Sequence, residues 1–270
     1  MTILVTGATD GLGRYVTTEL AKAGHRVLAH GRNPERLRAL RDELGVDTVQ
    51  ADLAELRQVD RLADEVLERV DRLAVLDNNA GVGAGADPRR REVSADGIEL
   101  RFAVNHLAGY HLAQRLAPKL VASAPARVVN VASIGQEPID FSDPLLERSY
   151  SGMRAYRQSK LAQIMAAIDL AEELRGTGVT VNALHPATLM PTTMVREGFG
   201  APLSTLEEGG RATLRLILDE GLATTTGRYF DSNRPDPADP HPQAGDPDAR
   251  RRLRELSDRL IAEALGRAPR

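Results

Sequence analysis

The chain has 270 residues, of which 42% are hydrophobic and 27% are charged, with a formal net charge of -3 and no cysteine. This composition is typical of a soluble globular protein and excludes disordered, collagen-like and disulfide-stabilised chains, together with thiolate nucleophiles and thiolate metal sites. Charges so nearly balanced argue against nucleic-acid binding, because a phosphate-binding surface needs an excess of cations.

Short apolar runs alternate with amphipathic patterns from the first residue onward. The apolar runs predict strands over residues 3–6, 26–30, 46–50, 73–77, 127–132, 179–184 and 228–230. Apolar residues spaced by three or four predict helices over residues 12–23, 34–44, 56–70, 97–120, 154–176 and 205–218. The repeated order predicts an α/β fold: a single doubly wound Rossmann-type domain with a predominantly parallel seven-stranded sheet and helices on both faces.

The C-terminal part departs from this alternation. Residues 231–248 contain five prolines, which disfavour regular structure, and a charged helical pattern follows over residues 249–265. We expect residues 1–270 to form one domain with this segment as its only appendage.

The hydropathy pattern predicts neither a membrane-spanning segment nor a leader peptide. Residues 1–7 run directly into an apolar strand without a basic region or a cleavage site. The longest apolar stretch, residues 161–171, includes Gln163 and Asp169 and is far shorter than the roughly 20 residues of a membrane span. The chain is therefore expected to be cytoplasmic, with no membrane partner.

A glycine-rich turn joins the first strand to the first helix and reads Thr6-Gly7-Ala8-Thr9-Asp10-Gly11-Leu12-Gly13. Gly7 permits a tight turn, Gly11 lets the backbone approach a pyrophosphate, and Gly13 permits close packing of helix on strand. The free amides at the start of the helix attract the anion. This context predicts a dinucleotide site, and the TGxxxGxG spacing resembles that of the short-chain dehydrogenase/reductase family.

The end of the second strand bears on which dinucleotide binds. An acidic residue at this place usually holds a free ribose 2'-hydroxyl, whereas a 2'-phosphate needs a cation there instead. Gly31 stands where the acid would be, and Arg32 offers a planar fork suited to phosphate. We therefore expect NADP(H) to be preferred, with NAD(H) possible. The alternative is that Arg32 is an ordinary surface residue in an arginine-rich chain.

Tyr156 and Lys160 form a YxxxK pair within a predicted helix, so their side chains lie one turn apart on the same face. The chain has only three lysines, Lys22, Lys119 and Lys160, among its 35 basic residues. An ammonium near a phenol is expected to lower the phenol's pKa from about 10 toward neutrality, which suits a general acid or base. Ser133, at the end of the fifth strand, can face the same crevice and hydrogen-bond a carbonyl oxygen.

The resemblance to the short-chain family covers nearly the whole chain, and residues 94–99 and 155–162 are similar to its retinol-dehydrogenase-like branch. The resemblance implies a catalytic tetrad of Asn105, Ser133, Tyr156 and Lys160, with Asn105 holding a water that links Lys160 to solvent. It also implies cofactor contacts, in addition to Tyr156 and Lys160, from Gly7, Asp10, Gly11, Leu12, Gly13, Arg32, Asp52, Leu53, Asn79, Ala80, Gly81, Pro186 and Thr192.

Two departures from the family pattern affect the segment after the sixth strand. Ala187 stands in place of a glycine, and Thr192 lies one residue further from Pro186 than in most members. Three histidines, His106, His111 and His185, lack companions at metal-ligand spacing, so no metal site is expected.

The sequence thus predicts an oxidoreductase that transfers a hydride between a nicotinamide cofactor and a carbonyl/alcohol pair. The alternative is a non-catalytic dinucleotide-binding sensor or partner-binding protein on the same fold. Homodimers or homotetramers formed through the helices that carry Asn105 and Tyr156 are expected from the family, and the apolar face over residues 161–170 agrees with an interface or with an internal core.

Two irregular stretches, residues 134–152 and 187–210, are expected to form the walls of the substrate site. Their apolar side chains suggest an apolar or moderately bulky carbonyl compound. These side chains are Phe141, Leu145, Leu146, Leu189, Met190, Met194 and Phe199.

Overall fold

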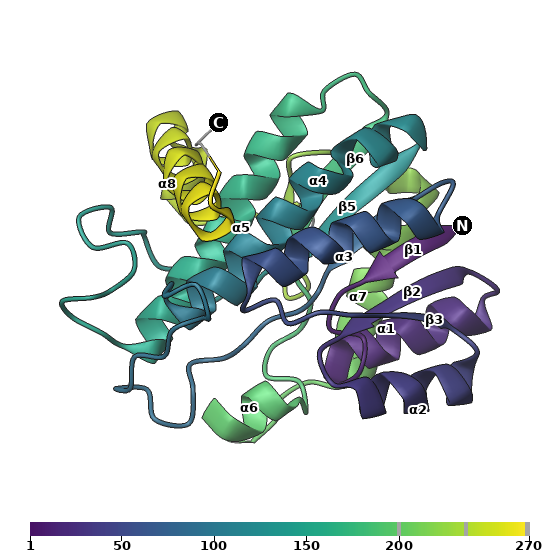
Figure 1. Ribbon diagram of the computed structural model, residues 1–270, viewed down its shortest axis with the longest axis horizontal. Coiled ribbons are helices and arrows are strands. Elements are labelled where there is room, and N and C mark those ends of the chain that lie inside the picture. Colours follow the sequence, from purple (N-terminus) through teal and green to yellow (C-terminus); the bar gives the residue numbers. More distant parts are fainter. Residues whose placement is uncertain (199–200, 235–236, 268–270) are drawn as a thin grey trace.

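The short apolar runs form strands that lie side by side and point the same way. The structure, a computed structural model, describes residues 1–198, 201–234 and 237–267, so Phe199 lies outside the described residues. Within them a single seven-stranded sheet has the order β3-β2-β1-β4-β5-β6-β7 with all neighbours parallel (Figure 1). The strands are β1 (Thr2–Val5), β2 (Arg26–Gly31), β3 (Asp47–Gln50), β4 (Val75–Asn78), β5 (Ala126–Val131), β6 (Val179–His185) and β7 (Tyr229–Asp231).

The strand order reverses between β1 and β4, which opens a crevice at the carboxyl ends of these two strands. The helices that connect the strands are α1 (Gly11–Lys22), α2 (Pro34–Leu44), α3 (Leu56–Arg69), η1 (Phe102–Leu107), α4 (Ala108–Ala122), α5 (Gly152–Glu173), α6 (Thr193–Gly198), α7 (Leu206–Leu218), η2 (Glu220–Leu222), η3 (Pro242–Gly245) and α8 (Pro247–Leu265). This is the doubly wound arrangement that the sequence predicted, and it places ligands at the switch point.

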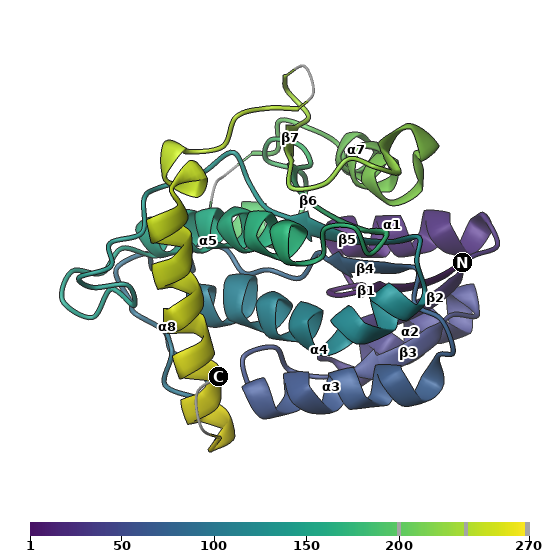
Figure 2. The same cartoon turned by 90° about the horizontal axis from the view of Figure 1, so that it is seen from above.

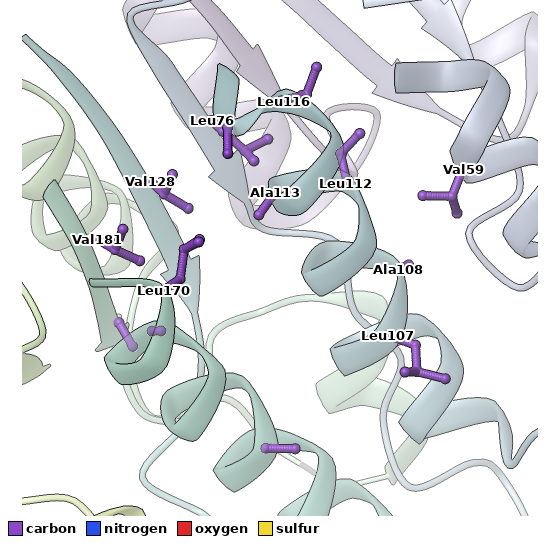
Figure 3. Close-up of a cluster of buried hydrophobic side chains, with 14 of the residues drawn as sticks. Val59, Leu76, Leu107, Ala108, Leu112, Ala113, Leu116, Val128, Leu170 and Val181 are labelled. Carbon is purple, nitrogen blue, oxygen red and sulfur yellow. The ribbon is translucent and has the colours of Figure 1, made fainter. Parts of the chain in front are cut away.

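Alternate residues of each strand supply two hydrophobic cores, one on each face of the sheet. Leu76, Val128 and Val181 point to the face covered by α3, α4 and α5, where Leu112 packs in the same cluster (Figure 3). Their strand neighbours contribute to the other cluster together with residues of α1, α2 and α7, and Figure 2 shows α1 and α7 on the side of the sheet opposite α3 and α4. Burial on both faces is the reason that the strands read as continuous apolar runs.

Side-chain caps fix several helix ends. Asn33 accepts hydrogen bonds from the amides of Glu35 (2.9 Å) and Arg36 (3.0 Å) before Pro34 begins α2. Thr205 and Glu208 form a reciprocal capping box at the start of α7. The final helix begins at Pro247, two residues earlier than residues 249–265 predicted, because Asp246 caps it.

Helical backbone before α4 begins later than the sequence predicted. Gly97 lies in a turn with φ of +77°, and Glu99 pairs with Val93 in an isolated bridge, so residues 97–99 are not helical. The first turns of the helix then widen into the π-helix η1, which carries Asn105. Such π segments occur often at functional sites.

The apolar face of α5 is covered within the chain itself. Leu253, Leu256 and Ile261 of α8 belong to the same buried cluster as Leu161 and Ile164 of α5. Among the helices of the described residues, none is long and apolar enough to cross a membrane.

One acidic residue is buried in the sheet without a compensating partner. Asp77 of β4 is 0% exposed and stands in register between Val5 of β1 and Val129 of β5. Among the described residues, neither oxygen of its carboxyl group has a hydrogen-bond partner. Burial raises the pKa of Asp77 to about 8, so the group is held in its neutral form at pH 7.

Replacing Asp77 with valine should stabilise the fold, and more so as the pH rises. The unfolded chain ionises this group near pH 4 and the folded chain only near pH 8, so the folded state binds more protons in between and stability is lost as the pH rises through that window. Chemical denaturation should show the advantage of Asp77→Val growing by about 4 kcal/mol between pH 5 and 8. The exposed Asp71→Asn variant is the control, and an advantage independent of pH would contradict this assignment.

Candidate active site

A cavity of about 460 Å³ opens at the carboxyl ends of β1, β2, β4, β5 and β6. Its lining includes Ser133, Tyr156 and Lys160 and each residue that the sequence predicted for cofactor contact. Asn105 lies directly behind this lining, where its Oδ1 accepts a hydrogen bond from the amide of Val82 (2.7 Å). The fold therefore brings the two predicted sets of residues, catalytic and cofactor-binding, to one crevice.

The glycine turn approaches its neighbours so closely that side chains would not fit. A Cβ atom on Gly13 would lie 2.3 Å from the carbonyl oxygen of Gly7 and 2.4 Å from Nδ2 of Asn79. Asn79 uses that nitrogen to donate to the carbonyl of Thr6 (2.8 Å), so the segment after β4 is joined to the turn. The result is a narrow backbone cradle of the kind that accepts a pyrophosphate.

Asp10 and the segment after β6 close one side of this cradle. Asp10 caps α1 by accepting from the amide of Gly11 (2.8 Å), and its other oxygen accepts from Thr193 Oγ1 (2.8 Å). Although burial raises the pKa of Asp10, these hydrogen bonds and the nearby charge of Arg36 outweigh it and hold the pKa below its usual value. The Cγ2 atom of Thr192 would lie 3.0 Å from a Cβ on Gly11, so Thr192 also reaches the turn.

His30 holds the turn from the opposite side, a role that the sequence did not reveal. Its Nδ1 accepts from the amide of Gly7 (3.2 Å), and its Nε2 lies 3.1 Å from the carbonyl of Ala51 at the end of β3. The ring is fully buried, and burial lowers its pKa to about 4. It is therefore neutral at physiological pH, with the proton on Nε2, where it can donate to Ala51.

The place of the ribose-binding acid is filled by a threonine side chain. A Cβ on Gly31 would lie 2.7 Å from Cγ2 of Thr9, so an aspartate at position 31 would displace Thr9. Arg32 follows with an exposed side chain at the same end of the cavity. Asp52 and Leu53 line this end as well, and Asp52 Oδ1 accepts from the amide of Ala54 (2.9 Å).

Lys160 is buried at the opposite end, against the last residue of β5. Its Nζ donates to the carbonyl of Val131 (2.8 Å) and to Gln163 Oε1 (2.9 Å). Burial lowers the pKa of Lys160 to about 7. The amine can therefore both take up and release a proton near neutral pH.

Tyr156 and Ser133 face each other across the crevice, and their hydroxyl groups are hydrogen-bonded. Burial raises the pKa of Tyr156, and the Ser133 hydrogen bond opposes this only in part. The prediction that Lys160 brings the phenol's pKa toward neutrality is wrong for this arrangement. The amine lies 5.8 Å from the centroid of the phenol ring, and its own burial weakens its positive charge.

Asn105 is held by the π-helix in a fixed orientation. Its Nδ2 donates to the carbonyl of Val82 (3.0 Å) and to Ser159 Oγ (2.9 Å), which fixes the amide. A Cβ on Gly81 would lie 3.3 Å from Asn105 Oδ1 and 3.4 Å from Lys160 Nζ. Gly81 thus keeps open a space that both polar atoms face.

Only part of the two stretches predicted as substrate walls lines the cavity. Leu189, Met190 and Met194 line the cavity, and Leu189 adopts a left-handed backbone with φ of +50°. Phe141 and Leu145 instead pack against the hydrophobic core, and Leu146 is buried away from the cavity lining. The sequence missed Met153, Val82 and Leu100, which do line the cavity.

The three histidines considered as metal ligands have other partners. His106 lies 2.8 Å from Ser257 Oγ, His111 lies 3.0 Å from Asp60, and His185 lies 3.1 Å from Thr188 Oγ1. The first two contacts join different helices, and the third joins the last residue of β6 to the loop that follows it.

Comparisons with known proteins agree with this geometry. The family model described as short chain dehydrogenase matches residues 1–200. Retinol dehydrogenase 13 of Homo sapiens is 33% identical over 284 residues, covering 96% of this chain and 84% of the relative. Retinol dehydrogenase 12 of Homo sapiens is 35% identical over 246 residues, covering 84% of this chain and 76% of the relative.

Solved structures show the same fold. A protein of Mycobacterium paratuberculosis superimposes with a TM-score of 0.77 at 27% identity, covering 96% of this chain and 92% of that chain. RhlG of Pseudomonas aeruginosa, solved as an NADP active-site complex, has a TM-score of 0.69 at 28% identity, covering 85% of this chain and 93% of that chain.

A parallel sheet with a glycine cradle at its switch point defines a dinucleotide-binding protein, and the matches name its family. The chain belongs to the short-chain dehydrogenase/reductase family and is similar to its retinol-dehydrogenase branch. It is an NAD(P)-dependent dehydrogenase that acts on alcohol and carbonyl groups.

Replacing His30 with leucine should weaken cofactor binding while leaving the fold intact. The variant removes the acceptor for the Gly7 amide, and a loss of about tenfold in affinity corresponds to one such hydrogen bond. Titration by reduced-nicotinamide fluorescence would measure this, and His30→Gln, which retains an acceptor and a donor, should recover part of the loss. Unchanged affinity in His30→Leu would show that the ring does not position the turn.

Proposed function

We propose that this chain is an NADP-preferring reductase or dehydrogenase whose substrate is an apolar or moderately bulky ketone, aldehyde or corresponding alcohol. The observation that carries the proposal is the grouping of Ser133, Tyr156 and Lys160 at one end of a cavity whose other end presents Arg32 beside a glycine cradle. The residues suited to proton transfer and the residues suited to cofactor binding therefore share one crevice.

The residues present fit a nicotinamide dinucleotide. The cradle of Gly7, Gly11 and Gly13 would take the pyrophosphate, and the exposed guanidinium of Arg32 would pair with a 2'-phosphate. Lys160 has a third donor position beyond its two hydrogen bonds and would bind the ribose hydroxyls. When bound, the nicotinamide supplies or accepts the hydride.

Side chains of the chain itself would donate and replace the proton. In the reductive direction Ser133 donates a hydrogen bond to the carbonyl oxygen, and Tyr156 gives its phenolic proton to the oxygen as negative charge develops there. The raised pKa of Tyr156 keeps this proton in place until it is needed. Lys160, whose pKa is about 7, would pass a replacement proton onward through a water in the space that Gly81 leaves beside Asn105.

The wall of the cavity favours an apolar substrate. Three of the chain's five methionines, Met153, Met190 and Met194, are among its described lining residues, with Ile134 and Leu189. Flexible thioether side chains adapt to apolar groups of different shapes. The names of the similar relatives, retinol dehydrogenases 12 and 13, support an apolar alcohol or aldehyde.

Replacing Tyr156 with phenylalanine should abolish turnover and leave cofactor affinity within twofold. The phenyl ring retains the packing but has no proton to give, so kcat should fall by at least about a thousandfold. The assay is the oxidation of reduced cofactor over a panel of apolar aldehydes and ketones. Tyr15→Phe on α1 is the matched control, and turnover retained in Tyr156→Phe would contradict the proposed role.

Replacing Arg32 with glutamine should selectively weaken the phosphorylated cofactor. Loss of a charge-assisted contact to phosphate costs roughly 1.5 to 3 kcal/mol, which corresponds to a rise in KM of about tenfold to a hundredfold for NADPH. The KM for NADH should not change, nor should either value in the exposed control Arg38→Gln. A wild-type protein that binds NADH more tightly than NADPH would refute the preference.

A further inference from the structure

The C-terminal segment, residues 237–267, lies across the layer of helices that carries the site. Figure 2 shows α8 running across the ends of α5, α4 and α3, far from the sheet. The turn η3 before it packs against α5. This is the segment for which the sequence predicted an irregular connector followed by a charged helix.

α8 is anchored to α4 and α5 by polar contacts as well as by apolar packing. Arg250 is 8% exposed, and it donates to Asp169 (2.6 Å), to Glu172 (3.1 Å) and to the carbonyl of Ala244 (3.1 Å). Tyr110 of α4 donates to Asp258 (2.7 Å). These contacts with α4 and α5 hold the C-terminal segment in place independently of the crevice.

The turn η3, which precedes α8, is hydrogen-bonded to the segment that follows β5. Gln243 Oε1 accepts from the amide of Ile139 (2.7 Å), and Gln243 Nε2 donates to the carbonyl of the same residue (3.1 Å). The amide side chain of Gln243 thus satisfies both backbone groups of Ile139, as a neighbouring strand would do in a sheet. The stretch over residues 132–151 has no helix or strand of its own, so contacts such as this one fix its path.

A second set of hydrogen bonds links the C-terminal segment to Ser133. The amide of His241 donates to Gln136 Oε1 (2.7 Å), and Gln136 Nε2 donates to the carbonyl of Ser133 (3.1 Å). Tyr229 of β7 donates to the same carbonyl (3.1 Å). The backbone of Ser133 is therefore held by two donors, one of which is itself oriented by the C-terminal segment.

We propose that residues 241–245 are a clamp that positions Ser133 and the first part of the substrate wall, with Gln136 and Gln243 as positioning residues. The proposal rests on the function proposed above, because it assigns the clamp to the carbonyl half of that site. The cofactor cradle lies at the other end of the crevice and makes none of these contacts among the described residues. The clamp should consequently affect the carbonyl substrate and not the cofactor.

Gln243→Met tests the clamp, because methionine keeps the length of the side chain but offers Ile139 neither an acceptor nor a donor of comparable strength. Hydrogen exchange would follow the amide of Ile139 and its neighbours in the full chain, and steady-state kinetics would follow the carbonyl substrate. We expect faster exchange confined to this stretch and a loss of about tenfold in kcat/KM for the carbonyl. The affinity for reduced cofactor should stay within twofold.

Arg251→Met is the matched control, since Arg251 lies on the exposed side of α8 and pairs with Asp248 and Glu255. Unchanged exchange at Ile139 in Gln243→Met would overturn the clamp. Faster exchange with unchanged kcat/KM, or an equal loss of cofactor affinity, would overturn its positioning role. If the wild-type protein reduces no carbonyl, the proposed function fails, and the exchange measurement still decides whether the clamp exists.

Discussion

The hydroxyl group of Thr6 joins the end of β1 to the segment that follows β4. Thr6, directly after β1, donates to the carbonyl of Asp77 (3.1 Å) and accepts from the amides of Asn79 (3.0 Å) and Ala80 (3.1 Å). The reversal of strand order brings β1 beside β4, and at the end of this strand pair the hydroxyl satisfies the amides of Asn79 and Ala80. The cofactor cradle on one side and the segment leading to Asn105 and Lys160 on the other therefore keep a fixed relation.

The residues that the sequence could predict belong to short local patterns. The glycine turn lies within eight consecutive residues, and the pair Tyr156 and Lys160 is fixed by helical spacing, so their relative positions can be predicted before the fold is known. The order of strands and helices followed from hydrophobic periodicity in the same way. The structure confirmed this fold and brought these residues to one crevice.

The residues that the sequence missed depend on pairing between distant segments. His30 matters because β2 lies between β1 and β3, which places its two nitrogens beside Gly7 and Ala51. Gln243 and Ile139 are far apart in the chain, and nothing in the sequence near either residue signals their contact. Phe141 and Leu145 were predicted to line the substrate site on composition alone, which cannot say which face of an irregular segment turns to the core.

The buried amine and phenol share one electrostatic constraint. Desolvation lowers the pKa of Lys160 to about 7 and raises that of Tyr156, so it favours the neutral form of each group. In the mechanism that we propose, the phenol would hold the proton and the amine would exchange protons with solvent. This division of labour suits an enzyme that must protonate an oxygen atom at the moment when hydride arrives.

The most direct measurement follows the hydride itself. The full chain would be incubated with an apolar aldehyde and NADPH that carries deuterium at both positions of nicotinamide C4, and the alcohol would be analysed by mass spectrometry. We predict an alcohol that contains a single deuterium, bound to the former carbonyl carbon. An alcohol without deuterium, or no alcohol from any aldehyde or ketone that fits the cavity, would contradict it.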